Sequence, residues 1–320
     1  MLREQRASLL HATDEQAQTF FNPLQACKNP RMLDDSNATT TNEKQINYWD
    51  QTAGPRWVAM QDSLDRLIGP LGVEARRRGA PGAGESVLDI GCGCGQTLLE
   101  LATNVGESGS VTGVDVSSPM VARANERAAA GGFKNIEAFV ADAQVYDFEP
   151  GAYDLVYSRF GVMFFDDPVA ALVNLRRAIE GGGRMSFVCW QAITENPWMF
   201  EPTRAAMAHV TVEAPTHPHT PGPFAFADRE RLLGLLTGAG FSDVLVEPFE
   251  VEMEVGGGAE LDQTVEFMLQ MGPAAQAVRE ADAQAAEAAR GAVREALEPF
   301  YSAERGVIMP GRSWMVSARA

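Results

Sequence analysis

The stretch Val87-Leu-Asp-Ile-Gly-Cys-Gly-Cys-Gly95 joins an apolar run, an acid and a turn that has glycine at every second position. The apolar residues predict a buried strand, and glycine, which lacks a Cβ atom, lets a backbone lie against a ligand. Gln96-Thr-Leu-Leu-Glu-Leu101 then predicts the start of a helix. This order places backbone N–H donors at the carboxyl edge of a parallel sheet, where α/β proteins bind nucleotide-like cofactors.

Three later segments extend this pattern. Ser110-Val-Thr-Gly-Val-Asp115 predicts a second strand, ending at about the distance where a dinucleotide fold places its ribose-binding acid. Residues 135–142 predict a third strand that ends in Asp142-Ala143, and residues 152–158 predict a fourth. Asp89, Asp115 and Asp142 are then expected at one edge of the sheet.

With these motifs the chain resembles the class I S-adenosylmethionine-dependent methyltransferases, in the branch of small-molecule and quinone-type enzymes, over most of residues 44–320. The resemblance implies an α/β fold: a doubly wound, seven-stranded, mostly parallel Rossmann-like sheet with an antiparallel last strand and helical cap or lid insertions. Residues 175–188 resemble the family's helix, glycine turn and fifth strand, although Glu180-Gly-Gly-Gly183 replaces the usual proline of the turn. Ser313–Arg319 resembles the antiparallel last strand.

The resemblance also implies how the cofactor, S-adenosylmethionine, is held. Asp89 and the glycine loop hold its methionine end, Asp115 the ribose hydroxyls, and Asp142 with Ala143 the adenine amino group. Residues 154–163 resemble the segment that forms the floor of the methyl-transfer site. The expected cofactor-binding residues are Asp89, Gly91, Cys92, Gly93, Gly95, Asp115, Val116, Met120, Asp142, Ala143, Ser158, Arg159 and Phe160.

The substrate is expected to be a small, partly apolar molecule, because aromatic residues and methionines follow the fourth strand and recur in residues 191–226. Ordinary core packing is the alternative for each of them. The candidate substrate-binding residues are Tyr48, Trp49, Trp57, Met163, Trp198 and Phe224.

No catalytic residue is assigned. S-adenosylmethionine is a sulfonium that already carries an activated methyl group. The protein has mainly to align the substrate atom that accepts the methyl group and to exclude water. His217, His219, Glu195 and Tyr157 are weak candidates for a general base, without a triad-like arrangement around them.

The chain has 320 residues and a formal net charge of −17. This acidity argues against a nucleic-acid partner, which needs a basic surface. The absence of a long apolar run and of a signal-peptide pattern predicts no membrane span and a cytoplasmic protein. We expect a monomer or homodimer.

Four cysteines, Cys27, Cys92, Cys94 and Cys189, form neither a disulfide framework nor a zinc-ligand spacing. Cys92 and Cys94 occupy variable positions of the glycine loop, where small residues are needed for close packing. We therefore expect no metal.

Residues 1–40 are expected to form a flexible N-terminal extension, and 41–320 the methyltransferase domain. The apolar positions between Glu43 and Ile68 predict two short helices that cover the cofactor side. A lid insertion is expected at about 191–227 and a helical insertion at about 260–300.

Two alternatives stay open. A non-catalytic, S-adenosylmethionine-binding regulatory module would share the acids and the glycine loop. An NAD(P)-dependent oxidoreductase is disfavoured by the Gly-x-Gly-x-Gly spacing, by Asp89 and by the absence of a Tyr-x-x-x-Lys pair.

Overall fold

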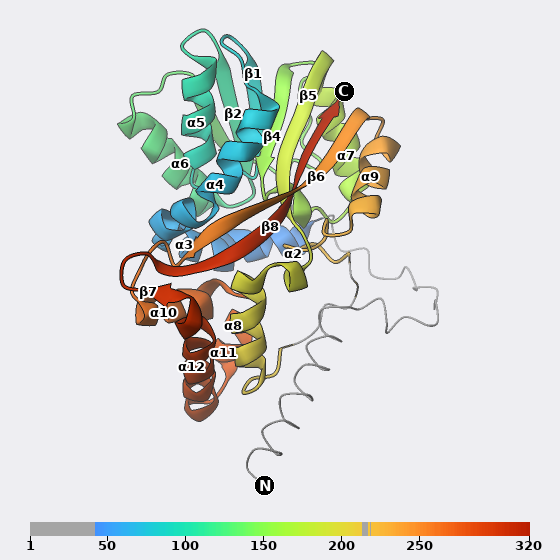
Figure 1. Cartoon of the computed structure of the whole chain (residues 1–320). Coiled ribbons are helices and arrows are strands. Elements are labelled where there is room, and N and C mark those ends of the chain that lie inside the picture. The colour runs from blue at the N-terminus through green and yellow to red at the C-terminus, as the bar shows by residue number, and fades with distance from the viewer. Residues whose placement is uncertain (1–41, 213–216, 218) are drawn as a thin grey trace, which may run out of the picture. The chain divides into compact units, whose positions relative to one another are not determined.

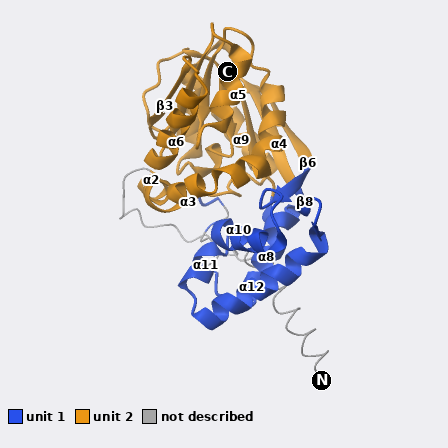
Figure 2. Ribbon diagram, turned by 90° about the vertical axis from the view of Figure 1, so that its left-hand side faces the viewer, with its two compact units in different colours: residues 1–36, 192–220, 250–311 blue, residues 37–191, 221–249, 312–320 orange. Residues whose placement is uncertain are grey.

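The computed structural model describes residues 42–212, 217 and 219–320. They divide into two compact units (Figure 2). The larger unit comprises residues 42–191, 221–249 and 312–320, and the smaller comprises the described parts of 192–220 together with 250–311. The expected N-terminal extension lies outside the described residues.

The sheet has the strand order β3-β2-β1-β4-β5-β8-β6, with β7 paired to β8 (Figure 1). Strands β1 to β5 run parallel to one another, and β8 runs antiparallel to β5, with Arg319 opposite Arg184 and Ser313 opposite Trp190. The expected antiparallel last strand is therefore confirmed, although it begins at Gly306 and not at Ser313. The strands are β1 (Ser86–Ile90), β2 (Ser110–Asp115), β3 (Ile136–Val140), β4 (Tyr153–Arg159), β5 (Ile179–Trp190), β6 (Ser242–Val255), β7 (Tyr301–Ser302) and β8 (Gly306–Arg319).

The helices of the larger unit alternate with its strands, as the apolar periodicity predicts. Asp167 and Asp228 begin two of them by accepting hydrogen bonds from Ala170 N and Arg231 N, which satisfies donors that a helix start leaves open. The elements are α2 (Glu43–Asn47), the π-helix η2 (Tyr48–Ala53), α3 (Gly54–Ala59), α4 (Gln61–Gly79), α5 (Gln96–Val105), α6 (Ser118–Ala130), the 3-10 turn η3 (Val162–Phe164), α7 (Pro168–Ala178) and α9 (Arg229–Gly238).

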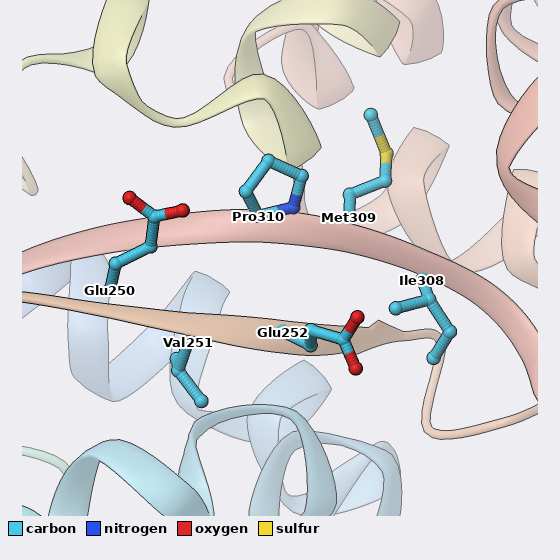
Figure 3. Close-up of a pocket in the computed structure, with 6 residues that line it drawn as sticks. All are labelled: Glu250, Val251, Glu252, Ile308, Met309 and Pro310. Atoms are coloured by element: carbon cyan, nitrogen blue, oxygen red, sulfur yellow. The ribbon is translucent and has the colours of Figure 1, made fainter.

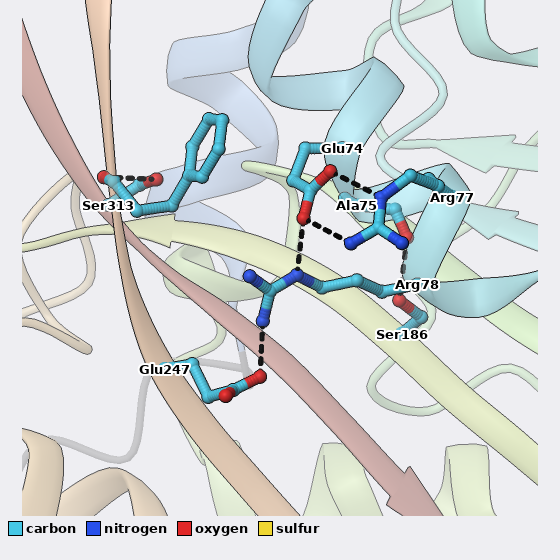
Figure 4. A network of polar contacts seen from close by, with 8 residues as sticks. Glu74, Ala75, Arg77, Arg78, Ser186, Glu247 and Ser313 are labelled. Carbon is cyan, nitrogen blue, oxygen red and sulfur yellow. Dashed lines mark hydrogen bonds and ion pairs between the residues drawn. The ribbon is translucent and has the colours of Figure 1, made fainter.

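Polar contacts join α4 to two strands of the sheet (Figure 4). Glu74 accepts from Arg77 and Arg78, both hydrogen bonds with Nε at 2.7 Å, and Arg78 Nη1 also reaches Glu247 of β6. The hydrogen bonds from Arg77, together with the one from Arg78 and against the opposing effect of burial, lower the pKa of Glu74 to about 2. Ser186 Oγ of β5 donates to Ala75 O at 2.9 Å. This network ties α4 to β5 and β6.

The glycine-rich start of β5 differs from the expected turn. β5 already pairs at Ile179 with Tyr153, and the next paired residues are Arg184 and Leu155, so the glycines bulge out of the ladder. Gly182 has a φ of 92°, which only glycine adopts readily. The bulge replaces a separate turn because pairing with β4 starts before the glycines.

The smaller unit contains mainly helices, and α12 packs against α8 and α10. The buried stripe Ala289, Val293 and Leu297 on α12 recurs every four residues, as a helix packed along one face requires. The described part of 192–220, which makes up most of the expected lid insertion, and the expected helical insertion at 260–300 thus belong to one unit, whereas residues 221–227 belong to the larger unit. Its helical elements are the 3-10 turn η4 (Ile193–Glu195), α8 (Pro197–Met207), α10 (Leu261–Met271), α11 (Ala275–Glu280), α12 (Ala283–Leu297) and the 3-10 turn η5 (Glu298–Phe300).

Across the described residues, none of the helices combines the length and the apolar character that crossing a bilayer requires.

Candidate cofactor and active site

The glycine loop after β1 adopts backbone conformations that favour glycine. Gly91, Gly93 and Gly95 have φ values of 68°, 54° and 82°. A Cβ atom on Gly91 would lie 2.7 Å from Gly161 Cα, and one on Gly95 would lie 2.8 Å from Ala124 Cβ. The first and third glycines are therefore needed for packing inside the protein.

Gly93 is different, because its Cβ position faces only the flexible end of Met120, at 3.1 Å from Cε. Its backbone N donates to Asp115 Oδ2 at 2.9 Å. Asp115 Oδ1 accepts from Ser117 N at 2.9 Å, and burial raises the pKa of this carboxyl. A carboxylate has about four acceptor positions, so Asp115 can hold the loop and still accept from ribose hydroxyls. Val116, the next residue, is half-buried.

Asp89 is fully buried at the end of β1. Thr97 Oγ1 donates to its Oδ2, whereas its Oδ1 has no hydrogen-bond partner among the described residues. Burial raises the pKa of Asp89 to about 7, against the opposing effects of Thr97 and Arg159. This carboxyl is poised to change its charge when a cation arrives.

Asp142 follows β3, as predicted. Its Oδ1 accepts from Asn42 Nδ2 at 3.2 Å and from Gln144 N at 3.0 Å. Its Oδ2 is buried without a partner in the described part of the chain. Ala143 is buried, and its carbonyl accepts from Asn174 Nδ2 at 3.1 Å.

These observations test whether S-adenosylmethionine fits. Buried acceptor atoms without partners are costly unless a ligand or water supplies donors, and both Asp89 and Asp142 offer one. Gly93 adds a backbone whose Cβ position meets only the flexible end of Met120. The donor-rich methionine, ribose and adenine parts of the cofactor suit this set of acceptors.

The residues at the end of β4 divide between two faces. Ser158 Oγ donates to Ile90 O at 2.7 Å and accepts from Gly161 N at 3.1 Å, which joins the loops after β1 and β4. Phe160 has a φ of 62° and stacks on Trp190, with ring centroids 4.1 Å apart. Ser158 and Phe160 therefore shape the loops that frame the candidate site.

Tyr157 and Arg159 lie on the opposite face of β4, since side chains alternate along a strand. The Tyr157 hydroxyl donates to Gly72 O of α4 at 2.9 Å, and burial raises its pKa. Arg159 donates to Gln96 at the start of α5 and lies 3.8 Å from Asp65. Because neither side chain is left facing a ligand, we omit Tyr157 from the base candidates and Arg159 from the proposed cofactor contacts.

Several substrate candidates gather after β4. Trp49 contacts Phe164, with ring centroids 5.0 Å apart, and it also contacts Trp57 and Tyr48. The carbonyl of buried Met163 accepts from Gly222 N at 3.1 Å. This hydrogen bond brings the segment with half-buried Phe224 back to the same loop.

The remaining candidates belong to the smaller unit. Trp198 is buried on α8, where its Cδ1 would lie 3.4 Å from a Cβ on Gly311, so it packs in the core of this unit. Glu195 is exposed. His217 is exposed, and its Nδ1 accepts from His219 N at 3.2 Å. The structure thus pairs the two histidines with each other in one turn.

A pocket of about 320 Å³ lies in the smaller unit between the extensions of β6 and β8 (Figure 3). Glu250, Val251 and Glu252 line it from β6, and residues 308–310 line it from β8. Glu252 is already paired with Arg305 at 2.8 Å. None of the expected cofactor residues takes part, so this pocket is distinct from the candidate cofactor site.

The described cysteines are buried. Burial raises the pKa of Cys92 and Cys189, and it raises that of Cys94 to about 12. Thiols with raised pKa values are poor nucleophiles and poor metal ligands. Among the residues that the structure describes, no group of three or more His, Cys, Asp or Glu side chains could hold a metal.

Three residues near the site were not predicted. Gly161 must be glycine because a Cβ there would lie 2.4 Å from Ile90 O, and its position directly after Phe160 was the available signal. Asp50 Oδ1 accepts from Ser118 N and Oγ, which lowers its pKa and ties η2 to α6. Asn42 has no local signal, because its partner Asp142 is remote in sequence.

Comparison with known proteins agrees with this geometry. Residues 87–183 match the family described as "Methyltransferase domain". The aklanonic acid methyltransferase DauC of Streptomyces sp. (strain C5) is 37% identical over 118 residues, which cover 37% of this chain and 54% of DauC. The demethylmenaquinone methyltransferase of Bacillus subtilis (strain 168) is 32% identical, over 37% of this chain and 48% of that protein. The chain thus spans about half the length of these relatives.

A solved structure of Haemonchus contortus phosphoethanolamine N-methyltransferase 2 in complex with S-adenosyl-L-methionine matches with a TM-score of 0.54. The match has 19% sequence identity and covers 88% of this chain and 60% of that chain. At this identity the likeness concerns the fold.

Residues 87–183 thus match a methyltransferase domain, and the strand order and the loop between Asp89 and Gly95 agree with that match.

Proposed function

We propose that this protein transfers a methyl group from S-adenosylmethionine to a small, partly apolar molecule. The observation that carries the proposal is the set of three acids at the ends of β1, β2 and β3. Asp89 and Asp142 each present a buried acceptor without a partner in the described residues, and Asp115 holds the glycine loop.

The cofactor supplies an activated methyl group on a sulfonium. The chain's own residues bind and orient it: Asp89 at the methionine end, Asp115 at the ribose and Asp142 at the adenine. The aromatic group of Trp49, Trp57 and Phe164 would exclude water near the methyl group and suits contact with a cation.

The acceptor is proposed to be a small molecule. Two relatives are named for aklanonic acid and demethylmenaquinone, which supports this class of substrate. We further propose a cytoplasmic monomer or homodimer, to be checked by fractionation and light scattering.

A methyl-transfer screen against a pooled metabolite extract, with mass spectrometry to locate the added methyl group, tests the activity. Turnover with formation of S-adenosylhomocysteine supports it. A protein that binds S-adenosylhomocysteine and methylates nothing in such pools would instead fit the regulatory binding module.

The affinity for S-adenosylhomocysteine is expected to fall as the pH drops from about 7 to 5. Asp89, with its pKa raised to about 7 by burial, is protonated below this value in the free protein. The ammonium group of the ligand favours the ionised carboxylate of Asp89, so binding below this pH must release a proton. The affinity should therefore fall by up to about tenfold for each pH unit below 7.

Calorimetry at several pH values measures this slope. Asp89→Asn cannot titrate, so its weaker binding should depend less on pH. Equal slopes in the two proteins would contradict the role of Asp89.

Single substitution of His217, His219 or Glu195 by alanine is expected to lower kcat by less than about a hundredfold, because alignment and desolvation dominate methyl transfer. The measurement is kcat at saturating concentrations of both substrates. A loss above about a thousandfold with both ligands still bound would identify that residue as the general base.

A further inference from the structure

Asn42 and Asp142, which follows β3, form a hydrogen-bonded pair of side chains, and each has a second, buried acceptor atom. Asn42 Nδ2 donates to Asp142 Oδ1 at 3.2 Å. This contact fixes the orientation of the amide, because an ionised carboxylate can only accept. The remaining oxygens, Asn42 Oδ1 and Asp142 Oδ2, are both buried without a hydrogen-bond partner among the described residues. A group with two donors would satisfy both.

Asn42 does not act as an ordinary helix cap. It directly precedes α2 with φ 64° and ψ 4°, and its side chain makes no hydrogen bond to that helix. An asparagine at this position normally accepts from the first turn. Here the side chain is only 7% exposed and is directed to Asp142 instead. The hydrogen bond to Asp142 therefore replaces a helix-cap hydrogen bond to α2.

We propose that Asn42 is a specificity residue for adenine: its Oδ1 and Asp142 Oδ2 each accept one N–H of the exocyclic amino group. This inference rests on the proposed function. The role of Asp142 follows from the family resemblance, whereas that of Asn42 follows from its contact with Asp142 and its orphaned oxygen. Hypoxanthine carries an oxygen where adenine carries the amino group. The hypoxanthine oxygen would place its lone pairs against Asn42 Oδ1 and Asp142 Oδ2. A site built to accept hydrogen bonds from an amino group rejects an analogue that lacks it.

Calorimetry with S-adenosylhomocysteine and with S-inosylhomocysteine, its hypoxanthine analogue, tests the inference. The unsubstituted protein should prefer the adenine ligand by at least about fiftyfold. Asn42→Gly removes the amide and keeps the positive φ without strain. It should weaken S-adenosylhomocysteine by about 3- to 20-fold, the loss of one hydrogen bond. It should not weaken S-inosylhomocysteine, because it removes one of the two acceptors that face the hypoxanthine oxygen.

Asn47→Ala, at an exposed position of the same helix, is the matched control and should leave both affinities unchanged. Thermal unfolding reports whether each variant folds, and Asn42→Ser serves as a second variant whose side chain is too short to reach the same position. Equal losses for both ligands would mean a general structural role and would overturn the inference. So would an unchanged preference for adenine in the variants. If the unsubstituted protein binds no S-adenosylhomocysteine, the proposed function itself fails, and this result is distinguishable from the others.

Discussion

Asp115→Ala is expected to weaken the binding of S-adenosylhomocysteine by about 10²- to 10⁴-fold. Two charge-assisted hydrogen bonds from ribose hydroxyls to the carboxylate would contribute about 1.5–3 kcal/mol each. The same substitution removes the acceptor of Gly93 N, so the glycine loop also loses its tie to β2. Titration calorimetry measures the effect.

Asp115→Asn keeps the shape of the side chain and one acceptor oxygen. Its affinity for S-adenosylhomocysteine should therefore lie between those of the unsubstituted protein and Asp115→Ala. Asp147→Ala is the control, because Asp147 is highly exposed and pairs only at the surface with Arg177, where an ion pair contributes little. The fold should survive, since Asp115 is a half-buried carboxyl whose pKa is raised by burial. An unchanged affinity in folded Asp115→Ala would refute the assignment of the ribose site.

Gly93→Val is expected to abolish detectable binding, a loss of more than about a hundredfold. The residue has a φ of 54°, which a β-branched side chain tolerates poorly. A valine would either push Met120 aside or move the loop, and its methyl groups would occupy space at the candidate site. Calorimetry and equilibrium dialysis measure the loss of binding.

Gly132→Val separates this effect from backbone strain alone. Gly132 has a φ of 74°, and its Cβ position has no neighbour within 4 Å. Both variants should lose stability through the positive φ, but only Gly93→Val should lose the ligand. Full affinity in Gly93→Val would show that the loop does not contact the cofactor.

Gly91→Val would not test whether the glycine loop contacts the cofactor. Its Cβ would meet Gly161 Cα at 2.7 Å, so loss of binding would follow from misfolding. The sequence showed three equivalent glycines, and only the packing around them separated one that faces the site from two that face the protein.

The class of protein was determined by local sequence. A strand, an acid, a glycine turn and a helix start lie within the few residues from Val87 to Leu101, and neighbouring residues along the chain define each of these elements. The predicted acids after β1, β2 and β3 follow for the same reason, because parallel strands end at one edge. The antiparallel last strand was predicted from the resemblance of Ser313–Arg319 to the family, although the strand begins at Gly306.

Tertiary structure alone decided which side chains face the site. Tyr157 and Arg159 alternate with Ser158 along β4, and the sequence does not show which face of a strand buried on both sides lies under α4. Asn42 acquires its partner only when the chain brings residue 142 beside it. The two insertions join in one unit through α8 and α12, which are remote in sequence. Contacts between segments that are remote in sequence leave no motif or periodicity in either segment. They are therefore visible only in the folded structure.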